Sequence, residues 1–240
     1  MTVIDALDYV RDNFSSSLAY RWFCGVKKCG LCSVMVDGRP ALSCWEPARS
    51  GMLVEPLRNF AVVKDLVIDR SKYDEIMLQM KPHEVRREPY PGYPEPIKPG
   101  EMLASMSASD CIECLVCMAA CPVLSEQDFQ GTPPFAGFVG PAPLVRLAKY
   151  QLDPRDGGDR SEILLMGRIE DCGSCNECSI ACPKEIDVLG DAIDGLRNDL
   201  ITRGVYHVRG WSLIRRLPRS IRKLAKCTLH LTFGEGPAKA

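Results

Sequence analysis

Cysteine is the residue type in this sequence with the greatest capacity for chemistry. Of 13 cysteines, only Cys227 stands alone, and the other twelve fall into three groups of four. These groups are Cys24, Cys29, Cys32 and Cys44; Cys111, Cys114, Cys117 and Cys121; and Cys172, Cys175, Cys178 and Cys182. A chain of 240 residues that starts without a secretory signal is not the small secreted protein in which many cysteines form disulfides. We therefore interpret the grouped thiols as metal ligands and Cys227 as a free thiol.

The first group has the spacing of thiolates that surround two irons. It reads C-x4-C-x2-C, and Cys44 follows after eleven further residues, which is the ligand order of plant-type [2Fe-2S] centres. Gly25 and Gly30 allow backbone N–H groups to approach the sulfurs. A structural zinc site is the alternative interpretation, but zinc usually takes two compact cysteine pairs, and Cys44 has no neighbouring cysteine.

The second and third groups repeat one motif, C-x2-C-x2-C-x3-C-P, at a distance of 61 residues. In bacterial ferredoxins this run gives three thiolates to one cluster and the fourth to the other. The three-residue step begins a helix that carries the fourth thiolate away, so crossed ligation follows from the local geometry. We predict one [4Fe-4S] cluster on Cys111, Cys114, Cys117 and Cys182, and a second on Cys172, Cys175, Cys178 and Cys121. The second cluster would be [3Fe-4S] if Cys175 were not a ligand.

The remaining composition excludes several other functions. Basic and acidic residues number 30 and 31, so the whole chain carries no electrostatic signature of nucleic-acid binding. His83, His207 and His230 are widely separated, and no glycine-rich phosphate loop precedes a helix, so we expect no flavin or nicotinamide in this chain. No apolar stretch reaches the roughly 20 residues of a membrane span. Three clusters without a reaction site of their own indicate an electron relay inside the cell.

Short elements must hold the first cysteine group. Apolar residues recur at helical spacing from Val3 to Phe14, which predicts an amphipathic helix of about three turns. The turn pair Asp37-Gly38 predicts a hairpin over residues 33–43 that leads into Cys44. A further strand is predicted at 52–55.

The second half of the chain is predicted to be helical. Five prolines between His83 and Gly100 predict a stiff connector. Beyond it, apolar spacing predicts helices over 144–152, 163–166 and 187–202, the last of which stops at Gly204. The predicted fold class is α+β, with a helix-plus-sheet [2Fe-2S] domain in 1–90, a helical domain with two cubane clusters in 91–205 and a basic tail in 206–240.

This order of domains resembles the iron-sulfur subunits of succinate dehydrogenases and fumarate reductases, in which a β-grasp [2Fe-2S] domain precedes a bacterial-ferredoxin-like helical domain. Residues 2–7 and 16–21, the loop to Cys44 and both Cys-Pro runs follow that family's order. The resemblance implies an FAD-containing flavoprotein subunit that oxidises succinate or reduces fumarate. It also implies electron transfer through the [2Fe-2S] cluster and then the cubanes towards a quinone at a membrane anchor subunit. The implied location is the cytoplasm or, through the partners, the inner face of the cell membrane.

The sequence departs from the family in three places. Cys175 fills a position that the common quinone-linked members lack, which implies a full [4Fe-4S] cluster of lower potential. Gly173 and residues 123–126 replace a histidine and a tryptophan that lie near the quinone in the family. The family's fold begins with a hairpin ahead of the helix with which this sequence starts. The first two departures weigh against direct contact with a quinone.

The last part of the chain is strongly basic. From Arg203 to Lys226 there are eight Lys or Arg residues and no Asp or Glu. Such a segment suits an anionic membrane surface or an acidic partner, and a solvated helix packed on the chain itself is the alternative. Two other functions stay open. One is the iron-sulfur subunit of a thiol-driven fumarate reductase or of another flavoprotein dehydrogenase, and the other is a stand-alone multi-cluster redox carrier.

Overall fold

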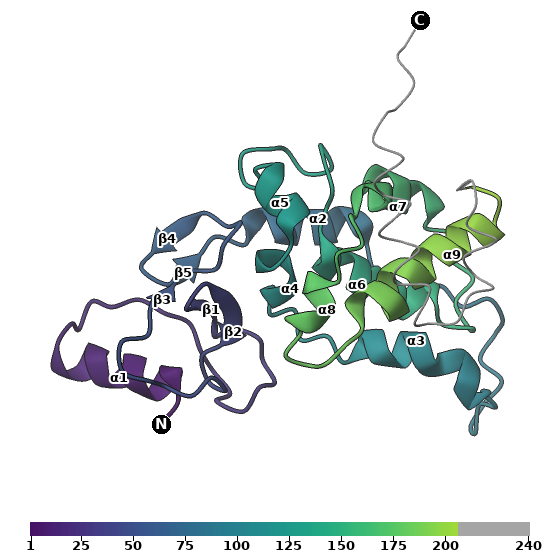
Figure 1. Cartoon of the computed structure of the whole chain (residues 1–240). Helices are drawn as coiled ribbons and strands as arrows, with labels where there is room; N and C mark the ends of the chain where they lie inside the picture. Colours follow the sequence, from purple (N-terminus) through teal and green to yellow (C-terminus); the bar gives the residue numbers. More distant parts are fainter. Residues whose placement is uncertain (206–240) are drawn as a thin grey trace, which may run out of the picture.

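The computed structural model describes residues 1–205, except for the side chain of Pro99. Along this part of the chain, a small helix-and-sheet unit is followed by a larger helical unit (Figure 1). This arrangement confirms the predicted α+β class. The predicted basic tail, 206–240, and Cys227 lie outside the described residues. Across residues 1–205, every helix is too short or too polar to cross a bilayer.

The predicted N-terminal helix is confirmed as α1 (Val3–Asn13). The Thr2 hydroxyl accepts a hydrogen bond from the Asp5 N–H, and the Asp5 carboxylate accepts one from the Thr2 N–H at 2.7 Å. This capping box satisfies backbone donors that the first helical turn cannot pair. The N–H groups of Val3 and Ile4 bond to the carbonyls of Glu46 and Ser43. The start of α1 is therefore fastened to the segment that carries Cys44.

The predicted hairpin is also confirmed. β1 (Ser33–Val36) pairs antiparallel with β2 (Arg39–Leu42), and both residues of the Asp37-Gly38 turn have the positive φ that a tight hairpin requires. β3 (Val54–Glu55) lies within the predicted strand and pairs with the other edge of β1, which gives the order β2-β1-β3. β1 is buried along its whole length, so this sheet forms a firm base for the loop before it.

Between β3 and the connector lie a second small sheet and a helix that the sequence patterns above do not predict. β4 (Val62–Lys64) pairs antiparallel with β5 (Val67–Ile68). The chain then enters α2 (Ser71–Met80), whose buried side chains Tyr73, Ile76 and Met80 join the core of the helical unit. α2 therefore ties the two units together.

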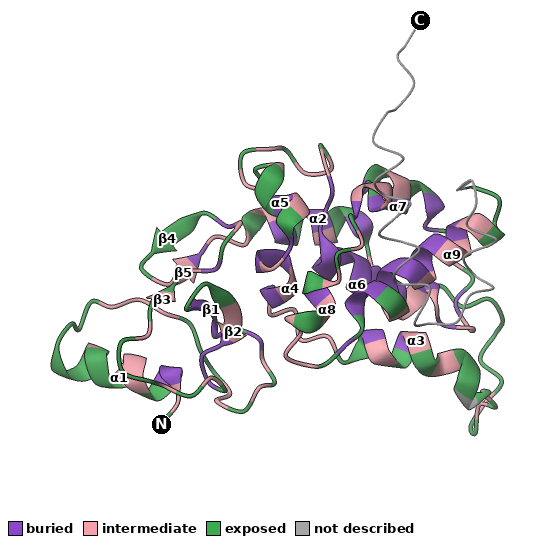
Figure 2. Ribbon diagram, viewed as in Figure 1, coloured by how far each residue is buried: buried purple, intermediate pink, exposed green. Residues whose placement is uncertain are grey.

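The described part of the helical unit is built around α6 (Pro141–Gln151), which is buried along most of its length (Figure 2). The other elements are α3 (Pro99–Ser109), α4 (Val116–Ala119), α5 (Pro122–Glu126), α7 (Ser161–Met166), η1 (Ile169–Asp171), α8 (Glu177–Ile180), η2 (Val188–Ile193) and α9 (Asp194–Thr202). The three predicted helices are confirmed by α6, by α7 and by η2 continued in α9. η2 is a π-helical segment that begins where the Asp187 carboxylate accepts a hydrogen bond from the Gly190 N–H.

The predicted connector is wrong at its C-terminal end, because α3 begins at Pro99. Proline is well accommodated in the first helical turn, where its missing N–H would have no partner and its φ is already helical. A proline that ends an irregular segment can thus be the first residue of a helix.

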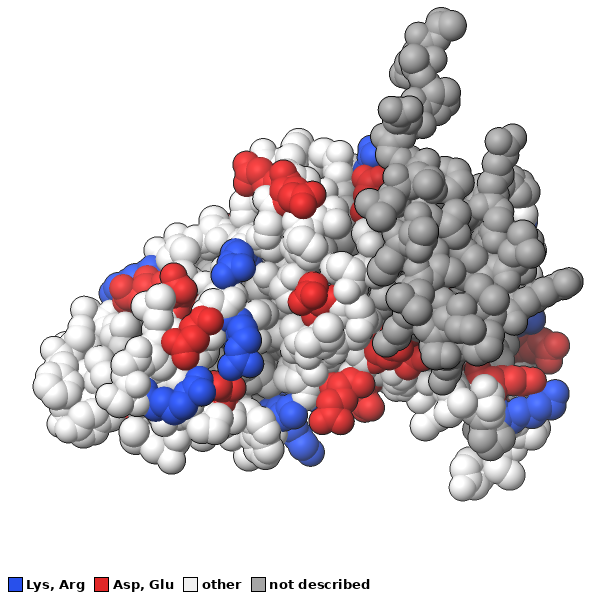
Figure 3. All heavy atoms as spheres, viewed as in Figure 1, with Lys and Arg blue, Asp and Glu red and all other residues white. Residues whose placement is uncertain are grey.

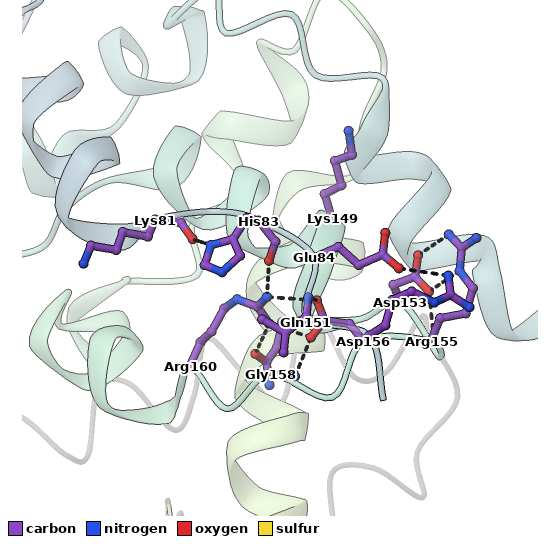
Figure 4. A network of polar contacts seen from close by, with 12 residues as sticks. Lys81, His83, Glu84, Lys149, Gln151, Asp153, Arg155, Asp156, Gly158 and Arg160 are labelled. Atoms are coloured by element: carbon purple, nitrogen blue, oxygen red, sulfur yellow. Dashed lines mark hydrogen bonds and ion pairs between the residues drawn. The ribbon is translucent and has the colours of Figure 1, made fainter. Parts of the chain in front are cut away.

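The rest of the connector is held against the helical unit by a polar network (Figure 4). Arg160 donates to both carboxylate oxygens of Asp156, at 3.0 and 2.8 Å, and to the amide oxygen of Gln151. Asp156 also accepts from the backbone N–H of Val85 in the connector, and Arg160 donates to the carbonyl of His83. Burial alone would raise the pKa of the Asp156 carboxyl, but the bonds from Arg160, Gly158 and Val85 hold it below its usual range. This network holds the start of the connector against the helical unit.

Candidate iron-sulfur sites

The loop after residue 23 turns backbone donors towards one sulfur. The N–H groups of Val26, Lys28 and Cys29 point at the Cys24 Sγ over distances of 3.4, 3.3 and 3.3 Å. These bonds stabilise the thiolate and lower the pKa of Cys24 to about 7. Positive φ angles at Gly25 and Lys27 let the chain curl in this way. The loop is thus preorganised for a negatively charged sulfur.

The fourth thiol of the first group, Cys44, approaches Cys32 and Cys24 from the hairpin side. The Ser43 N–H donates to the carbonyl of Cys32 at 2.9 Å, which fixes the end of the hairpin against the loop. Burial raises the pKa of Cys44 to about 11, and the neighbouring thiols of Cys32 and Cys24 contribute to this rise. Cys24 in turn interacts with Cys29. The structure therefore brings together all four cysteines that the sequence assigned to a [2Fe-2S] centre.

A second group of thiols lines a cavity in the helical unit. The cavity holds about 360 Å³ of unfilled space, part of it open to solvent, and is lined by Cys111, Cys114, Cys117 and Cys182 among others. Burial raises the pKa of the Cys114 thiol to about 12 and that of Cys117 well above its usual value. Without a compensating cation, four thiolates could not be charged together in this place.

The remaining four cysteines line a separate cavity of about 310 Å³, again partly open, to which Cys121, Cys172, Cys175 and Cys178 contribute. Burial raises the pKa of Cys178 to about 12 and that of Cys121 to about 11. Cys172 and Cys178 are buried, whereas Cys175 is exposed. This second cavity therefore has one thiol at the surface of the molecule.

The exchange of the fourth cysteines between the cavities has a local cause. The third cysteine of each run lies in a short helix, α4 in the first run and α8 in the second, and these two helices pack together. Each helix begins one residue before this cysteine, and so earlier than the predicted start in the step to the fourth cysteine. Each short helix carries the chain across to the other cavity, where Cys121 or Cys182 follows. The Asn59 side chain supports one crossing point, because its Nδ2 donates to the carbonyls of Met118 and Cys121 at 2.9 and 3.3 Å.

The thiol sets fit multi-iron clusters in their chemistry. Iron-sulfur clusters are held by sets of four thiolates, and iron supplies the positive charge that buried thiolates need. Among residues 1–205, no three His, Cys, Asp or Glu side chains converge closely enough to hold one metal ion. Thiols that ring a wider space are consistent with a cluster of several irons. That these cysteines are the ligands stays a prediction.

The first cysteine group, which includes Cys32 and Cys44, adjoins the cavity lined by Cys111, Cys114 and Cys117. Val116 of α4 packs with Ile4, Leu42 and two cysteines of the first group, Cys32 and Cys44. The backbone of the Cys111–Cys114 loop also touches Gly30, where an added Cβ would lie 2.4 Å from the Ile112 carbonyl oxygen. The loop of the first cysteine group is therefore in direct contact with the Cys111–Cys114 loop.

Two polar residues that support the cavities lie outside every motif in the sequence. Arg197 of α9 is buried and donates to the carbonyls of Ile169 and Cys172 at 2.9 and 2.8 Å and to the Ser174 hydroxyl at 2.9 Å. Asn59 comes from the N-terminal unit, far from Cys121 in the sequence. No local pattern marks either residue, because their partners are brought to them only by the fold.

Asn59→Gly is expected to destabilise the protein by about 1–2 kcal/mol through the loss of the bonds to Met118 and Cys121. Glycine is the suitable replacement because Asn59 has a φ of 70°, which other side chains tolerate poorly. Anaerobic denaturant titration would measure the change, with Asn13→Gly as a test of general sensitivity to loss of an asparagine. Unchanged stability in Asn59→Gly would contradict the supporting role.

The comparison with known families agrees with this division. Residues 1–75 match the family described as "2Fe-2S iron-sulfur cluster binding domain" and residues 107–186 match the "4Fe-4S dicluster domain". An uncharacterized iron-sulfur protein of Methanocaldococcus jannaschii is 32% identical over 86% of this chain and 40% of its own length. A subunit of the CoM/CoB fumarate reductase of Methanothermobacter marburgensis is 30% identical over 99% of this chain and 47% of its own length. The chain thus spans less than half the length of these two relatives.

Two further proteins are matched over most of both chains. The fumarate reductase iron-sulfur subunit of Haemophilus influenzae is 35% identical over 78% of this chain and 77% of its own. Among solved structures, the Mycobacterium smegmatis Sdh1 complex in the apo form contains a chain with a TM-score of 0.74 and 27% identity, over 86% of this chain and 87% of that one. Together with the two cysteine-rich units, these likenesses show that the chain belongs to the electron-transfer iron-sulfur subunits of the succinate dehydrogenase and fumarate reductase family.

Proposed function

We propose that this chain relays electrons between an FAD-containing flavoprotein subunit and a second protein, through one [2Fe-2S] and two [4Fe-4S] clusters. The observation that carries the proposal is the gathering of twelve cysteines into three sets of four, with Cys121 and Cys182 exchanged between the two cavities. When bound, the clusters supply one-electron chemistry. The chain's own residues supply the thiolates and orient them. For the domains, we keep 1–90 and 91–205 as the proposed units.

The surface around the first group suits a protein partner. Five large apolar side chains on the loop and beside it are exposed, with Phe23 at 78% and Trp45 at 62%, and the others are Trp22, Val26 and Leu31. Exposed aromatic and apolar side chains of this kind are typical of interfaces. We assign this face to the flavoprotein subunit, and we take succinate and fumarate as the favoured substrate couple of that partner.

The opposite end of the relay lies at Cys175. Ile180 of α8 is 72% exposed beside the second cavity, and the nearby Glu177, Glu185 and Asp187 are exposed as well. Figure 3 shows acidic side chains predominating around α8, whereas both signs alternate over the N-terminal unit. An acidic surface favours a basic protein partner by charge complementarity. We therefore propose a protein partner at this end, and a quinone in a membrane anchor subunit is the alternative.

A thiol-driven fumarate reductase is the second candidate function. Cys175 and Gly173 favour it, because they replace features of the quinone-linked proteins in the segment that lines the second cavity. The relative from the CoM/CoB fumarate reductase also matches almost the whole chain. In this version a thiol-oxidising protein would take the place of the quinone-binding anchor.

Purification of the native protein under anaerobic conditions tests the proposal. We expect a flavoprotein with FAD to copurify, about ten irons per chain, and no EPR signal of a three-iron centre in the oxidised protein. Identification of the other copurifying proteins distinguishes a membrane anchor from a thiol-oxidising partner. A colourless protein loaded with zinc would refute the clusters, and isolation as a lone iron-sulfur protein would favour the stand-alone carrier.

A further inference from the structure

A charged side chain lies in the Cys111–Cys114 loop, beside the proposed first [4Fe-4S] cluster, which is called the first cubane below. Glu113 lies between Cys111 and Cys114, lines the same cavity as they do, and has a φ of 52°. Its carboxylate meets two partners from different elements. The Tyr73 hydroxyl of α2 donates to Oε2 at 3.0 Å, and the Arg146 guanidinium of α6 has its Nε 3.1 Å from Oε1.

These three side chains lie largely out of solvent. Tyr73 is 1% exposed, and the Arg146 and Glu113 side chains are 21% and 34% exposed. Burial raises the pKa of Tyr73, and the Glu113 charge raises it further, so the phenol is neutral and able to donate. Charges that water screens poorly act more strongly on their neighbours.

Both charges lie close to the cavity of the first four-iron site. Glu113 lines this cavity together with Cys111 and Cys114, and Arg146 contacts the Glu113 carboxylate from α6, whose Val145 lines the same cavity. A nearby positive charge favours a cluster that has gained an electron, and a nearby negative charge opposes it. The two side chains therefore act on the same site with opposite sign.

We propose that Glu113 and Arg146 form a charge pair that sets the reduction potential of the first cubane, with Tyr73 as the positioning residue that holds the Glu113 carboxylate. The inference rests on the proposed [4Fe-4S] cluster at Cys111, Cys114, Cys117 and Cys182. Reduction adds one electron, and hence one negative charge, to that cluster. Arg146 stabilises the reduced form, Glu113 disfavours it, and the Tyr73 hydroxyl offsets part of the carboxylate charge.

The internal repeat provides a matched control. Ser174 occupies in the second run the place that Glu113 occupies in the first. Ser174 is also contacted by an arginine, because Arg197 Nη1 donates to its hydroxyl at 2.9 Å, but the contact involves no carboxylate of the loop. Variants of Ser174 are therefore expected to leave the potential of the first cubane unchanged.

The test is an EPR-monitored redox titration of the full-length protein with its clusters. We expect the midpoint potential of the first cubane to rise in Glu113→Gln and to fall in Arg146→Gln. The double variant should lie close to the wild type, and Arg146→Lys should restore much of the loss. Tyr73→Phe should lower the potential by less than Arg146→Gln does, and it should have little effect in the Glu113→Gln background.

Opposite shifts separate an electrostatic role from a merely structural one. Glu113→Gln and Arg146→Gln break the same ion pair, so loosening of the loop would shift the potential in the same direction in both. The inference would be overturned if the two variants shifted the potential in the same direction. It would also be overturned if both variants retained the wild-type iron content and neither shifted the potential. If the wild type showed no reduced [4Fe-4S] signal at all, the proposed relay itself would fail instead.

Discussion

Replacing Cys175 by alanine is expected to remove about one iron per chain and to give the oxidised protein the EPR signal of a three-iron centre. The reason is the place of this thiol, which lines the second cavity together with Cys121, Cys172 and Cys178. Alanine offers no ligand atom, so the iron opposite position 175 would have no protein ligand. The other three thiols would still hold three irons. Iron analysis and EPR of the air-free protein measure both changes.

The fold itself should survive this substitution. Cys175 is exposed, so the variant removes little packing, and the [2Fe-2S] and first cubane signals should remain. Cys227→Ala is the matched control, because this cysteine belongs to none of the three groups. A Cys175→Ala protein with the full iron content and no three-iron signal would show that Cys175 is not a ligand. A wild-type protein that already gives the three-iron signal would lead to the same conclusion.

The three cysteine sets can be predicted from the sequence because the spacing of cysteines along the chain determines the local backbone geometry. A run of three cysteines at intervals of three fixes a tight turn, and a short helix that contains the third cysteine leads to the fourth. The structure places Cys121 and Cys182 at the opposite cavities, in line with that expectation, although ligation itself stays a prediction. The hairpin before Cys44 was equally local, since Asp37-Gly38 specifies its turn.

Features that depend on distant contacts were not predicted. Asn59 reaches Cys121 across 62 residues, and Tyr73 reaches Glu113 across 40. The sequence around Asn59 and Tyr73 contains no pattern from which these distant partners could be predicted. α2 is a different case, because Tyr73, Ile76, Met77 and Met80 have helical spacing, so its periodicity could have been recognised. The short strands β4 and β5 give too few residues for any period to appear.

Gly30→Ala is expected to destabilise the protein by roughly 3 kcal/mol or more and to slow electron transfer between the [2Fe-2S] cluster and the first cubane. Gly30 has a φ of 71°, and a Cβ there would lie 2.4 Å from the Ile112 carbonyl oxygen and 3.1 Å from the Cys114 Cα. Both contacts are with backbone, which cannot rotate out of the way as a side chain can. The two cluster loops would have to move apart, and tunnelling of an electron becomes slower as the distance grows.

Gly25→Ala separates the effect of backbone strain from the effect of the contact. Gly25 lies in the same loop with a φ of 66°, but an added Cβ there meets nothing within 4 Å. This variant should therefore cost only the conformational strain of about 1–2 kcal/mol and leave the transfer rate near that of the wild type. Anaerobic denaturant titration measures the stabilities, and rapid-freeze EPR after reduction follows the electron from one cluster to the next. Equal losses of stability and rate in the two variants would mean that strain in the loop, and not the close approach of Gly30 to the Cys111–Cys114 loop, determines both.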